Sequence, residues 1–338
     1  MPGRATTPGP ATRSDTTEGT GGVTLTIGVD VGGTKVAGGV VDDQGVVLAQ
    51  TRRDTPAHDP AGTRDTIVAV VAELAAEYPE ATAVGIGAAA WIDAAGATVL
   101  FAPNLAWRNE PLREYVSSAV GIPVVVENDA NAAAWAEFRY GAAEDVDDSM
   151  VMFTVGTGIG GGIVLGGQIL RGAHGMAAES GHMLAVPEGH LCGCGRMGCL
   201  EQYASGNALV RFAREGALTS PEAAKLLLEK AGGGVGAITG VMVTEAAQEG
   251  DAVAVDAFEQ IAYWLAQGCA DIAQLLDPHV IVIGGGVIEA GDLLMGPLRR
   301  EYLNALTQRG KLPVADVRHA EMGNRAGVIG AVDLARER

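Results

Sequence analysis

The sequence predicts an α/β protein of two lobes built on a repeated strand–turn–strand unit. Its 338 residues are enough for about two domains. Two apolar, β-rich runs at residues 24–45 and 150–170 each surround a cluster of glycines, although they lie far apart in the chain. Segments with the apolar spacing of helices lie between and after them. We therefore predict an old duplication, with a cleft between the two copies.

The first lobe opens with TLTIGVDVGGTKVAGGVVDDQG at residues 24–45, which reads as a hairpin because a glycine turn separates two β-rich runs. After this hairpin the apolar spacing alternates between helical and extended periods. The elements that it predicts, in order, are a helix at 65–78, a strand at 83–92, a helix at 112–120, a strand at 123–126 and a helix at 130–140.

The second lobe begins with MVMFTVGTGIGGGIVLGGQIL at residues 150–170, which repeats the plan of the first hairpin. This stretch carries no charge and is long enough to span a bilayer. Its many glycines would weaken a membrane helix, so we predict a buried hairpin instead. The remaining predicted elements are helices at 208–215, 221–231 and 253–276, a buried strand at 279–287 and a helix at 327–336.

The domain organisation follows from these elements and from composition. Residues 1–22 are rich in Thr, Gly and Pro and lack apolar periodicity, so we expect a disordered tail. We expect a small α/β domain at 23–135, joined by a C-terminal helix at 327–338. The large α/β domain is expected at 136–326 and contains the cysteine-rich motif.

Composition and charge exclude several classes of protein. Hydrophobic residues make up 48% of the chain and charged residues 19%, with 49 glycines, which excludes a fibrous or disordered protein. The formal net charge of −18 would repel a phosphate backbone, so we expect no nucleic-acid partner. Four cysteines in a long chain without an apolar leader favour the reducing cytoplasm, and we expect no membrane partner.

Three glycine turns stand beside predicted strands, namely DVGGTK at 30–35, TVGTGIGGG at 154–162 and GGG at 284–286. Backbone N–H groups can converge on an anion at such turns because no Cβ blocks the approach, although most glycine turns only reverse the chain. The second turn matches the dinucleotide fingerprint GxGxxG. A strand rather than a helix is expected after it, and this argues against dinucleotide binding.

One histidine and three cysteines have the spacing of a metal site. The pattern His182 … Cys192-x-Cys194-x4-Cys199 supplies one nitrogen and three sulfurs, the ligand set of a closed tetrahedral structural zinc site. The alternatives are a redox pair or three unrelated buried thiols. Glycines beside the cysteines permit tight ligand loops and argue against both. Cys269 lies in an apolar helical run and is expected in the core.

Four motifs, in this order, resemble the ROK family of repressors, open reading frames and kinases. They are DVGGTK at 30–35, ENDANAAAWAE at 127–137, ESGH at 179–182 and CGCGRMGCLEQ at 192–202. The resemblance runs from about residue 24 to the C-terminus, and RGAHGMAAESGHM and CLEQYASGNAL make it strongest to the bacterial glucokinases of the family. It implies the duplicated actin-like/ribonuclease H-like sugar kinase fold, with the active site in the cleft. It also implies transfer of a phosphoryl group from ATP to the 6-hydroxyl of glucose.

The resemblance implies that Asp129 is the general base that accepts the proton of the sugar hydroxyl. Asp129 follows a predicted strand and precedes a helix, where α/β sheets place ligand-binding residues, but a helix N-cap would have the same spacing. If one ring nitrogen of His182 binds zinc, the other is held in place to contact the sugar. The implied sugar contacts are Asn104, Asn128, Asp129, Glu179, His182 and Glu201; by residue type alone they also fit turn asparagines and surface charges.

For the nucleotide, the resemblance assigns the glycine turns to the phosphates and the third of them to the adenosine. Asp30 would help to hold Mg²⁺, through water, although by sequence alone it also fits a turn residue. The implied nucleotide contacts are Asp30, Gly32, Gly33, Thr34, Lys35, Thr157, Gly158, Gly160, Gly285 and Gly286.

The family leaves alternatives open. Its kinases include enzymes for mannose, fructose and N-acetylhexosamines and enzymes that use polyphosphate, and it also includes sugar-responsive repressors. A repressor would need a DNA-binding head before the first phosphate turn, and we expect none here because that turn already begins by Asp30. The acidic charge of the chain also argues against DNA binding. Ala90 and Trp91 stand where many members carry a glycine and a smaller or different aromatic residue, so the resemblance predicts the reaction but leaves the choice among these sugars open. The family implies a homodimer or homotetramer.

Overall fold

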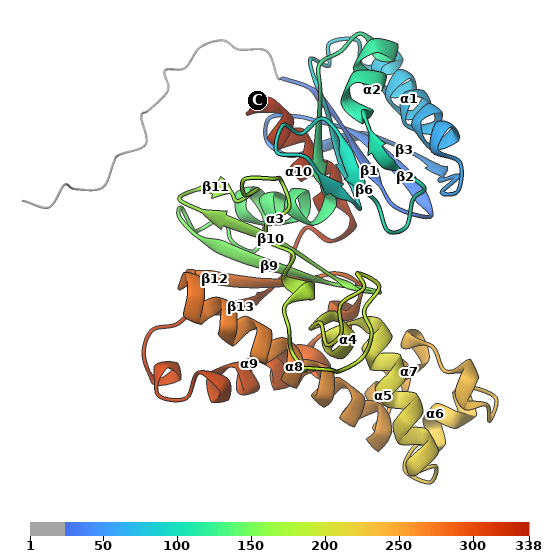
Figure 1. The fold of residues 1–338 in the computed structure, drawn as a ribbon, viewed down its shortest axis with the longest axis vertical. Coiled ribbons are helices and arrows are strands. Elements are labelled where there is room, and N and C mark those ends of the chain that lie inside the picture. Colours follow the sequence, from blue (N-terminus) through green and yellow to red (C-terminus); the bar gives the residue numbers. More distant parts are fainter. Residues whose placement is uncertain (1–23, 338) are drawn as a thin grey trace, which may run out of the picture.

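The first five-stranded sheet of the computed structural model has an antiparallel hairpin followed by two parallel strands (Figure 1). The structure describes residues 24–337, so the tail predicted at 1–22 lies outside the described residues. The strand order is β3-β2-β1-β4-β8, with β1 at Thr26–Val31, β2 at Lys35–Val41, β3 at Val47–Asp54, β4 at Val84–Ala88 and β8 at Val124–Asn128.

A second five-stranded sheet repeats this topology. Its order is β11-β10-β9-β12-β13, again a hairpin followed by two parallel strands. The strands are β9 at Met150–Val155, β10 at Ile159–Leu165, β11 at Gln168–Ile169, β12 at Val280–Gly284 and β13 at Asp316–His319. The predicted repeat of two related lobes is therefore confirmed.

Helices cover both faces of the first sheet. Helix α1 (Pro60–Glu77) lies on one face and α10 (Ala326–Arg336) on the other. Neighbouring glycines of β2 show this alternation, because a Cβ on Gly38 would meet Val70 of α1 and a Cβ on Gly39 would approach Val328 of α10. Helix α2 (Leu112–Val120) packs against α1. A small sheet of β5 (Trp91–Ile92), β6 (Val99–Phe101) and β7 (Arg108–Glu110) lies at the edge of the first sheet, where β5 contacts β8.

Helices α3 (Asp129–Tyr140) and α10 cross between the two sheets and hold them together (Figure 1). The buried carboxylate of Asp333 in α10 accepts hydrogen bonds from the indole of Trp135, at 2.8 Å, and the hydroxyl of Tyr140, at 2.7 Å. The backbones approach closely because Gly330 has no side chain: a Cβ there would lie 1.7 Å from the carbonyl oxygen of Ala132.

The large lobe is mainly helical on the far side of its sheet. Its buried core is rich in alanine, which lets the long helix α8 pack closely against α9 and α5. The helices are α4 at Glu201–Ala204, α5 at Gly206–Thr219, α6 at Lys225–Lys230, α7 at Gly240–Gln248, α8 at Ala252–Leu276 and α9 at Asp292–Leu306.

Several predicted boundaries were wrong for local reasons. The helix predicted at 65–78 begins at Pro60, because Asp59 caps it and proline suits the first turn. The strand predicted at 83–92 is interrupted after Ala88, and the helix predicted at 221–231 is reduced to α6. Among the described helices, none is both long and apolar enough to cross a membrane, and residues 150–170 form the predicted hairpin.

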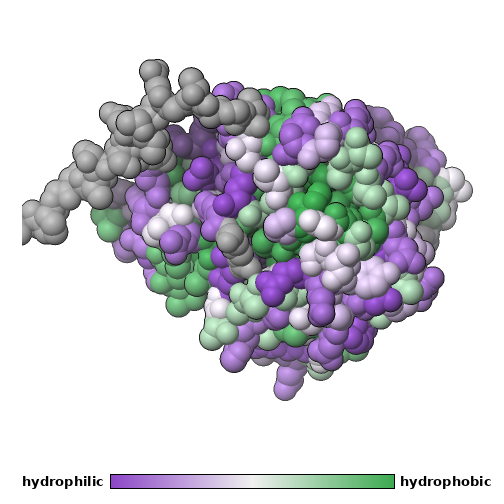
Figure 2. Space-filling view, turned by 90° about the horizontal axis from the view of Figure 1, so that it is seen from above, coloured by the Kyte–Doolittle hydropathy of each residue, from purple (hydrophilic) through white to green (hydrophobic). Residues whose placement is uncertain are grey.

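Surface hydropathy agrees with this packing. Seen from above, hydrophilic residues cover most of the rim of the molecule, and hydrophobic residues occupy smaller areas between them (Figure 2). The apolar residues of α1 and α10 are mostly buried against the first sheet. The hydrophobic core of each lobe therefore includes the central strands of its sheet.

The close contact of α10 with α3 predicts a large cost for a single methyl group. Gly330→Ala should lower the free energy of unfolding by about 1–3 kcal/mol, because the helices must move apart. The matched variant is Gly296→Ala in α9, where a Cβ would meet nothing within 4 Å. That change should be neutral or stabilise by up to about 1 kcal/mol. Urea unfolding of both variants checks this, and equal stabilities would contradict the packing.

Candidate active site and metal centre

The residues expected to contact sugar lie together in a cavity of about 320 Å³ between the two sheets. They come from both lobes, since one group lies after β6 and at the end of β8, and the other lies beyond the hairpin of β9 and β10. Strand ends and the loops after them are where α/β sheets bind ligands. The predicted residues that line this cavity are Asn104, Asn128, Asp129, Gly158, Gly160, Glu179, His182, Glu201 and Gly285.

Two further cavities adjoin the first. One, of about 410 Å³, has Asp30, Lys35, Asp129, Gly285 and Gly286 in its wall. The other, of about 560 Å³, is bordered by Thr157 and Gly286 together with α7 and the start of α5. The first and second cavities share Asp129 and Gly285, and the second and third share Gly286. Together they form a continuous path from the first lobe to α7.

Three of the predicted nucleotide residues, Gly32, Gly33 and Thr34, line none of these three cavities. The N–H of Gly32 donates to the carbonyl of Lys35 at 3.0 Å, so the first turn is closed on itself. A Cβ on Gly33 would lie 3.1 Å from the Cβ of Asn104, which places this turn directly behind the sugar-side loop.

The part of the third cavity that α7 lines was not predicted from the sequence. No motif marks this helix, and its role is visible only in the fold, where α5 and α7 face the third glycine turn. Asn207 could have been predicted, because it belongs to the run CLEQYASGNAL, which resembles the family. The missed lining residues are Asn207, Gly240, Val241, Thr244, Glu245 and Gln248.

Asp129 is the first residue of α3, and its neighbour Asn128 is the N-cap. The side-chain oxygen of Asn128 accepts the N–H of Asn131 at 2.9 Å, while its amide donates to the carbonyl of Ala90 at 3.1 Å. The alternative in which Asp129 caps the helix is therefore wrong. Asp129 instead lies in the first turn, where the helix dipole favours a negative charge.

Burial raises the pKa of Asp129, and hydrogen bonding from the N–H groups of Ala130 and of Asp129 itself partly offsets that rise. Asp30, at the end of β1, faces the same space. Its pKa is raised to about 6 by burial and by the negative charge of Asp129, while Lys35 acts in the opposite direction. Two half-buried carboxylates thus line the same cavity.

On the sugar side, Glu179 lies next to His182 and below Trp91. Its carboxylate is 3.9 Å from Nε2 of His182 and accepts a hydrogen bond from Trp91. Burial raises the pKa of Glu179, against the charge of His182 and that hydrogen bond. The Trp91 ring packs on Phe101 with centroids 5.2 Å apart. The unusual residue noted in the sequence therefore reaches the cavity.

Glu201 connects the cavity to the cysteine loop. One of its oxygens accepts the N–H of Ile159 at 3.0 Å, and the other lies 3.5 Å from the sulfur of Cys192. Gly158 is packed against this carboxylate, since a Cβ there would lie 2.3 Å from it. The position of Glu201 is thus fixed by the second glycine turn on one side and by the cysteine loop on the other.

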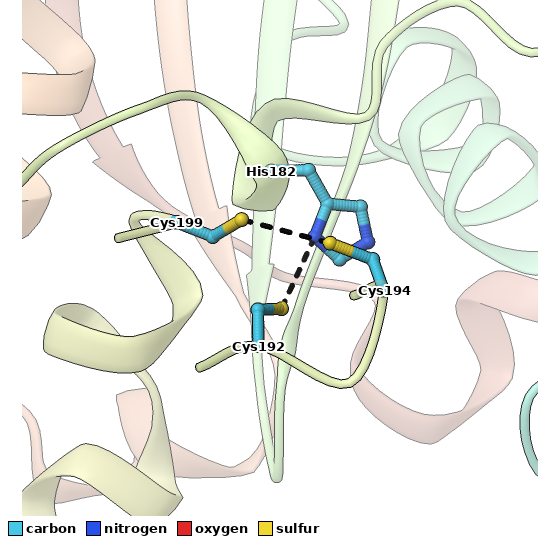
Figure 3. Close-up of side chains that lie close together, drawn as sticks. All are labelled: His182, Cys192, Cys194 and Cys199. Atoms are coloured by element: carbon cyan, nitrogen blue, oxygen red, sulfur yellow. Dashed lines mark hydrogen bonds between the residues drawn. The ribbon is translucent and has the colours of Figure 1, made fainter. Parts of the chain in front are cut away.

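The four predicted metal ligands converge on one point (Figure 3). Nδ1 of His182 is 3.7 Å from the sulfur of Cys192, the sulfurs of Cys194 and Cys199 are also 3.7 Å apart, and all four ligand atoms lie within 4.8 Å of one another. A tetrahedral zinc ion with bonds of about 2.0–2.3 Å would separate its ligands by about 3.5–3.8 Å. The donor set and its spacing therefore fit zinc.

The geometry also decides between the alternatives for these cysteines. Three sulfurs and a nitrogen around one point are neither unrelated thiols nor an isolated redox pair. The tight turn has Gly195 at φ 88° and Gly198 at φ 81°, where glycine is favoured. Cys269 is fully buried in α8, as predicted for a core residue.

Comparison with known proteins finds similar sequences and structures over most of this chain. The family model described as ROK family matches residues 26–338. The glucokinase of Streptomyces coelicolor is 49% identical, and the alignment covers 93% of this chain and 98% of that protein. An N-acetylmannosamine kinase of Yersinia pseudotuberculosis is 34% identical, and that alignment covers 92% of this chain and 98% of the relative. Among solved structures, a ROK family glucokinase from Streptomyces griseus in complex with glucose and AMPPNP is 50% identical with a TM-score of 0.83. That alignment covers 93% of this chain and all of the other.

The raised pKa of Asp30 predicts how stability depends on pH. Because this pKa is about 6 in the folded chain and 3.8 is its ordinary value, the folded state binds the proton more tightly than the unfolded state. The resulting stabilisation is complete below the ordinary value and is lost as pH rises through about 6. Asp30→Asn does not titrate, so its stability relative to the parent should increase by roughly 1–3 kcal/mol between about pH 4 and pH 7.

Urea unfolding at a series of pH values measures this difference. The matched variant is Asp43→Asn, at an exposed turn after β2, which should show no comparable trend. A constant difference between Asp30→Asn and the parent across the range would show that burial and the charge of Asp129 do not act on this carboxyl.

Proposed function

This chain belongs to the ROK family, and from that membership we infer that it is an ATP-dependent glucokinase, which transfers the γ-phosphoryl group of ATP to the 6-hydroxyl of glucose. The observation that carries this inference is the cavity between the lobes. It joins a half-buried carboxylate at a helix N-terminus to a set of hydroxyl-binding groups and to two adjoining cavities large enough for a nucleotide. The duplicated two-lobed fold is that of the ROK sugar kinases.

We propose that Asp129 is the general base. Its carboxylate accepts the proton of the 6-hydroxyl as the oxygen attacks the γ-phosphorus, and ADP leaves on the opposite side. The raised pKa makes it a stronger base than an exposed aspartate, while the helix N-terminus favours its ionised form. Its place where the first and second cavities meet is where sugar and phosphate would have to come together.

The remaining sugar hydroxyls are bound, in this proposal, by the polar groups around the first cavity. Carboxylates accept from hydroxyls, and amides can both donate and accept. A site that pairs each hydroxyl discriminates against analogues that leave a buried partner unpaired. The groups are Asn104, Asn128, Glu179, His182 and Glu201.

The nucleotide would occupy the second and third cavities. Its adenosine would lie between α5, α7 and Gly286, and its phosphates near Thr157, Gly285 and Lys35. Lys35 and the glycine-turn amides would neutralise phosphate charge. We also propose that Gly32, Gly33 and Thr34 contact the phosphates once the lobes close, as the family resemblance implies; Gly33 lies directly against Asn104 of the sugar cavity.

We propose that Asp30 holds Mg²⁺. The two carboxylates of Asp30 and Asp129 face each other, and their repulsion contributes to the raised pKa of Asp30. A cation near Asp30 would relieve that repulsion, which is why the donor set fits magnesium. Bound with ATP, the ion supplies positive charge at the phosphates.

We propose that His182, Cys192, Cys194 and Cys199 hold a structural zinc ion. The metal would fix the imidazole through Nδ1, leaving Nε2 beside Glu179 at the sugar cavity. It would also fix Glu201 through the loop that ends in Cys199. A reducing cytoplasm, which we propose as the location, keeps the thiols available to the metal, and the family suggests a homodimer or homotetramer.

One alternative within the family deserves testing. The N-acetylmannosamine kinase relative suggests a second substrate class, and the bulky Trp91 next to Glu179 could change which sugars fit. The direct experiment measures ADP formation with glucose, mannose, fructose, N-acetylglucosamine and N-acetylmannosamine. Glucose should give the highest kcat/KM, and a higher value for any other sugar would overturn the glucokinase assignment.

The same assay tests the base. Asp129→Asn should lower kcat by about 10²–10⁴-fold, because it removes the proton acceptor but keeps the shape of the side chain. Glucose binding measured by calorimetry should change far less than kcat. Asp43→Asn serves as the control and should keep the parental kcat. A kcat for Asp129→Asn within a factor of about three of the parent would exclude general-base catalysis by this residue.

Zinc removal should weaken sugar binding as well as folding. Cys199→Ser, or chelation of the metal, should abolish the one equivalent of zinc expected by elemental analysis. Either change should lower the melting temperature and weaken glucose binding by about tenfold or more, since His182 and Glu201 lose their support. Cys269→Ala, outside the cluster, should keep its zinc and its glucose affinity despite some loss of stability. Full glucose affinity in zinc-free protein would refute the link.

A further inference from the structure

An ion pair between the lobes lies directly behind the proposed base. Glu127 is the penultimate residue of β8 in the first sheet, and Arg171 follows β11 of the second. Nε of Arg171 donates to one oxygen of Glu127 at 2.6 Å, and the two side chains are only 24% and 5% exposed, respectively. Neither residue lines the three cavities. Their contact therefore needs an explanation other than binding a substrate.

The second oxygen of Glu127 holds the start of α3. It accepts the backbone N–H of Asn128 and the side-chain amide of Asn131, each at 3.1 Å. Asn128 precedes Asp129 and caps the helix, and Asn131 provides the N–H that is capped. The carboxylate of Glu127 is thus bonded on both sides of Asp129, and a shift of this carboxylate would shift the base.

Arg171 begins the segment that leads to Glu179. Residues 171–179 turn sharply, with φ of 73° at Gly172 and 82° at Gly175. The segment touches the first lobe again at Gly175, where a Cβ would lie 2.2 Å from the carbonyl of Ile92, and at its end, where Trp91 donates to Glu179. The same segment therefore contacts the first lobe at its beginning, middle and end.

We propose that the Glu127–Arg171 pair is a positioning contact for the phosphoryl transfer, which fixes Asp129 relative to the sugar-binding Glu179. Arg171 ties the beginning of the 171–179 segment to the carboxylate that holds the first turn of α3. The base and the sugar clamp then move as one unit. This proposal rests on the function proposed above and adds two residues that touch neither substrate.

Charge and burial make this pair suited to the task. A charge-assisted hydrogen bond between a guanidinium and a carboxylate is short and directional, and the low exposure of both groups limits screening by solvent. Loss of either partner takes a short ion pair away from a charge that stays poorly exposed, whereas loss of both removes the two charges together. Stability and positioning can therefore be separated by comparing single and double variants.

The experiment compares Arg171→Met, Glu127→Gln and the double variant with Arg64→Met. Arg64 forms a pair with Glu110 of similar length and burial, 3.0 Å with 25% and 11% exposure, within the first lobe and away from the cleft. Arg171→Met should lower kcat by about ten- to a hundredfold and leave the KM for ATP within about twofold, because a small displacement of the base is costly. Arg64→Met should lower the melting temperature with the parental kcat.

The double variant supplies the decisive readout. It should regain part of the melting temperature lost in either single variant, because both charges of the pair are gone, while its kcat stays as low as that of Arg171→Met. Recovery of kcat together with stability would overturn the proposal, as would an equal loss of kcat in Arg64→Met. If the parent protein does not phosphorylate glucose, the proposed function itself fails, and that result is evident before any variant is measured.

Discussion

The site depends on keeping carboxylates ionised where burial disfavours their charge. Asp129 and Asp30 face each other between the lobes, and burial raises the pKa of both. Opposing effects come from the start of α3 and from Lys35. Because Asn128 takes the capping position, Asp129 is left in the first turn with its carboxylate available to the cavity. One residue of offset thus separates a structural asparagine from the proposed base.

A zinc ion at the His–Cys cluster would solve a second problem, which is to fix polar groups on a segment that has little regular structure. Between β11 and α4 the chain has one short helical turn, at Ser180–His182, and no strand, yet His182 and Glu201, the first residue of α4, must keep their orientation. His182 presents one nitrogen to the cysteines and the other towards Glu179, and Glu201 lies between Cys192 and the second glycine turn. A zinc ion bound to four side chains would reinforce the two isolated bridges, Leu184 with Cys199 and Leu191 with Met197, that hold this segment.

The sequence was most informative where chemistry requires fixed residue types at fixed spacing. The two hairpins and the His–Cys cluster were predicted from glycine runs and ligand spacing, and the structure confirms them. Elements whose pattern is weak were missed. Helix α9 contains Gly296 and Pro297, which oppose a helical prediction, and the edge strand β3 is largely exposed. Contacts that depend on distant packing, such as the wall formed by α7 or the pairing of Glu127 with Arg171, leave no local pattern at all.

The charge around the cavities bears on the phosphoryl donor. Among the described residues that line the three cavities, Lys35 is the one Lys or Arg. The acidic lining residues are Asp30, Asp129, Glu137, Glu179, Glu201, Glu245 and Glu289. A long polyphosphate would need a channel of cations to neutralise its repeated charges, and an acidic chain with net charge −18 offers none here. A nucleotide makes a smaller electrostatic demand, since its adenosine is neutral and fits between α5 and α7. Its phosphates can rely on backbone N–H groups, one lysine and a divalent cation. The distribution of charge therefore favours ATP over polyphosphate as the donor.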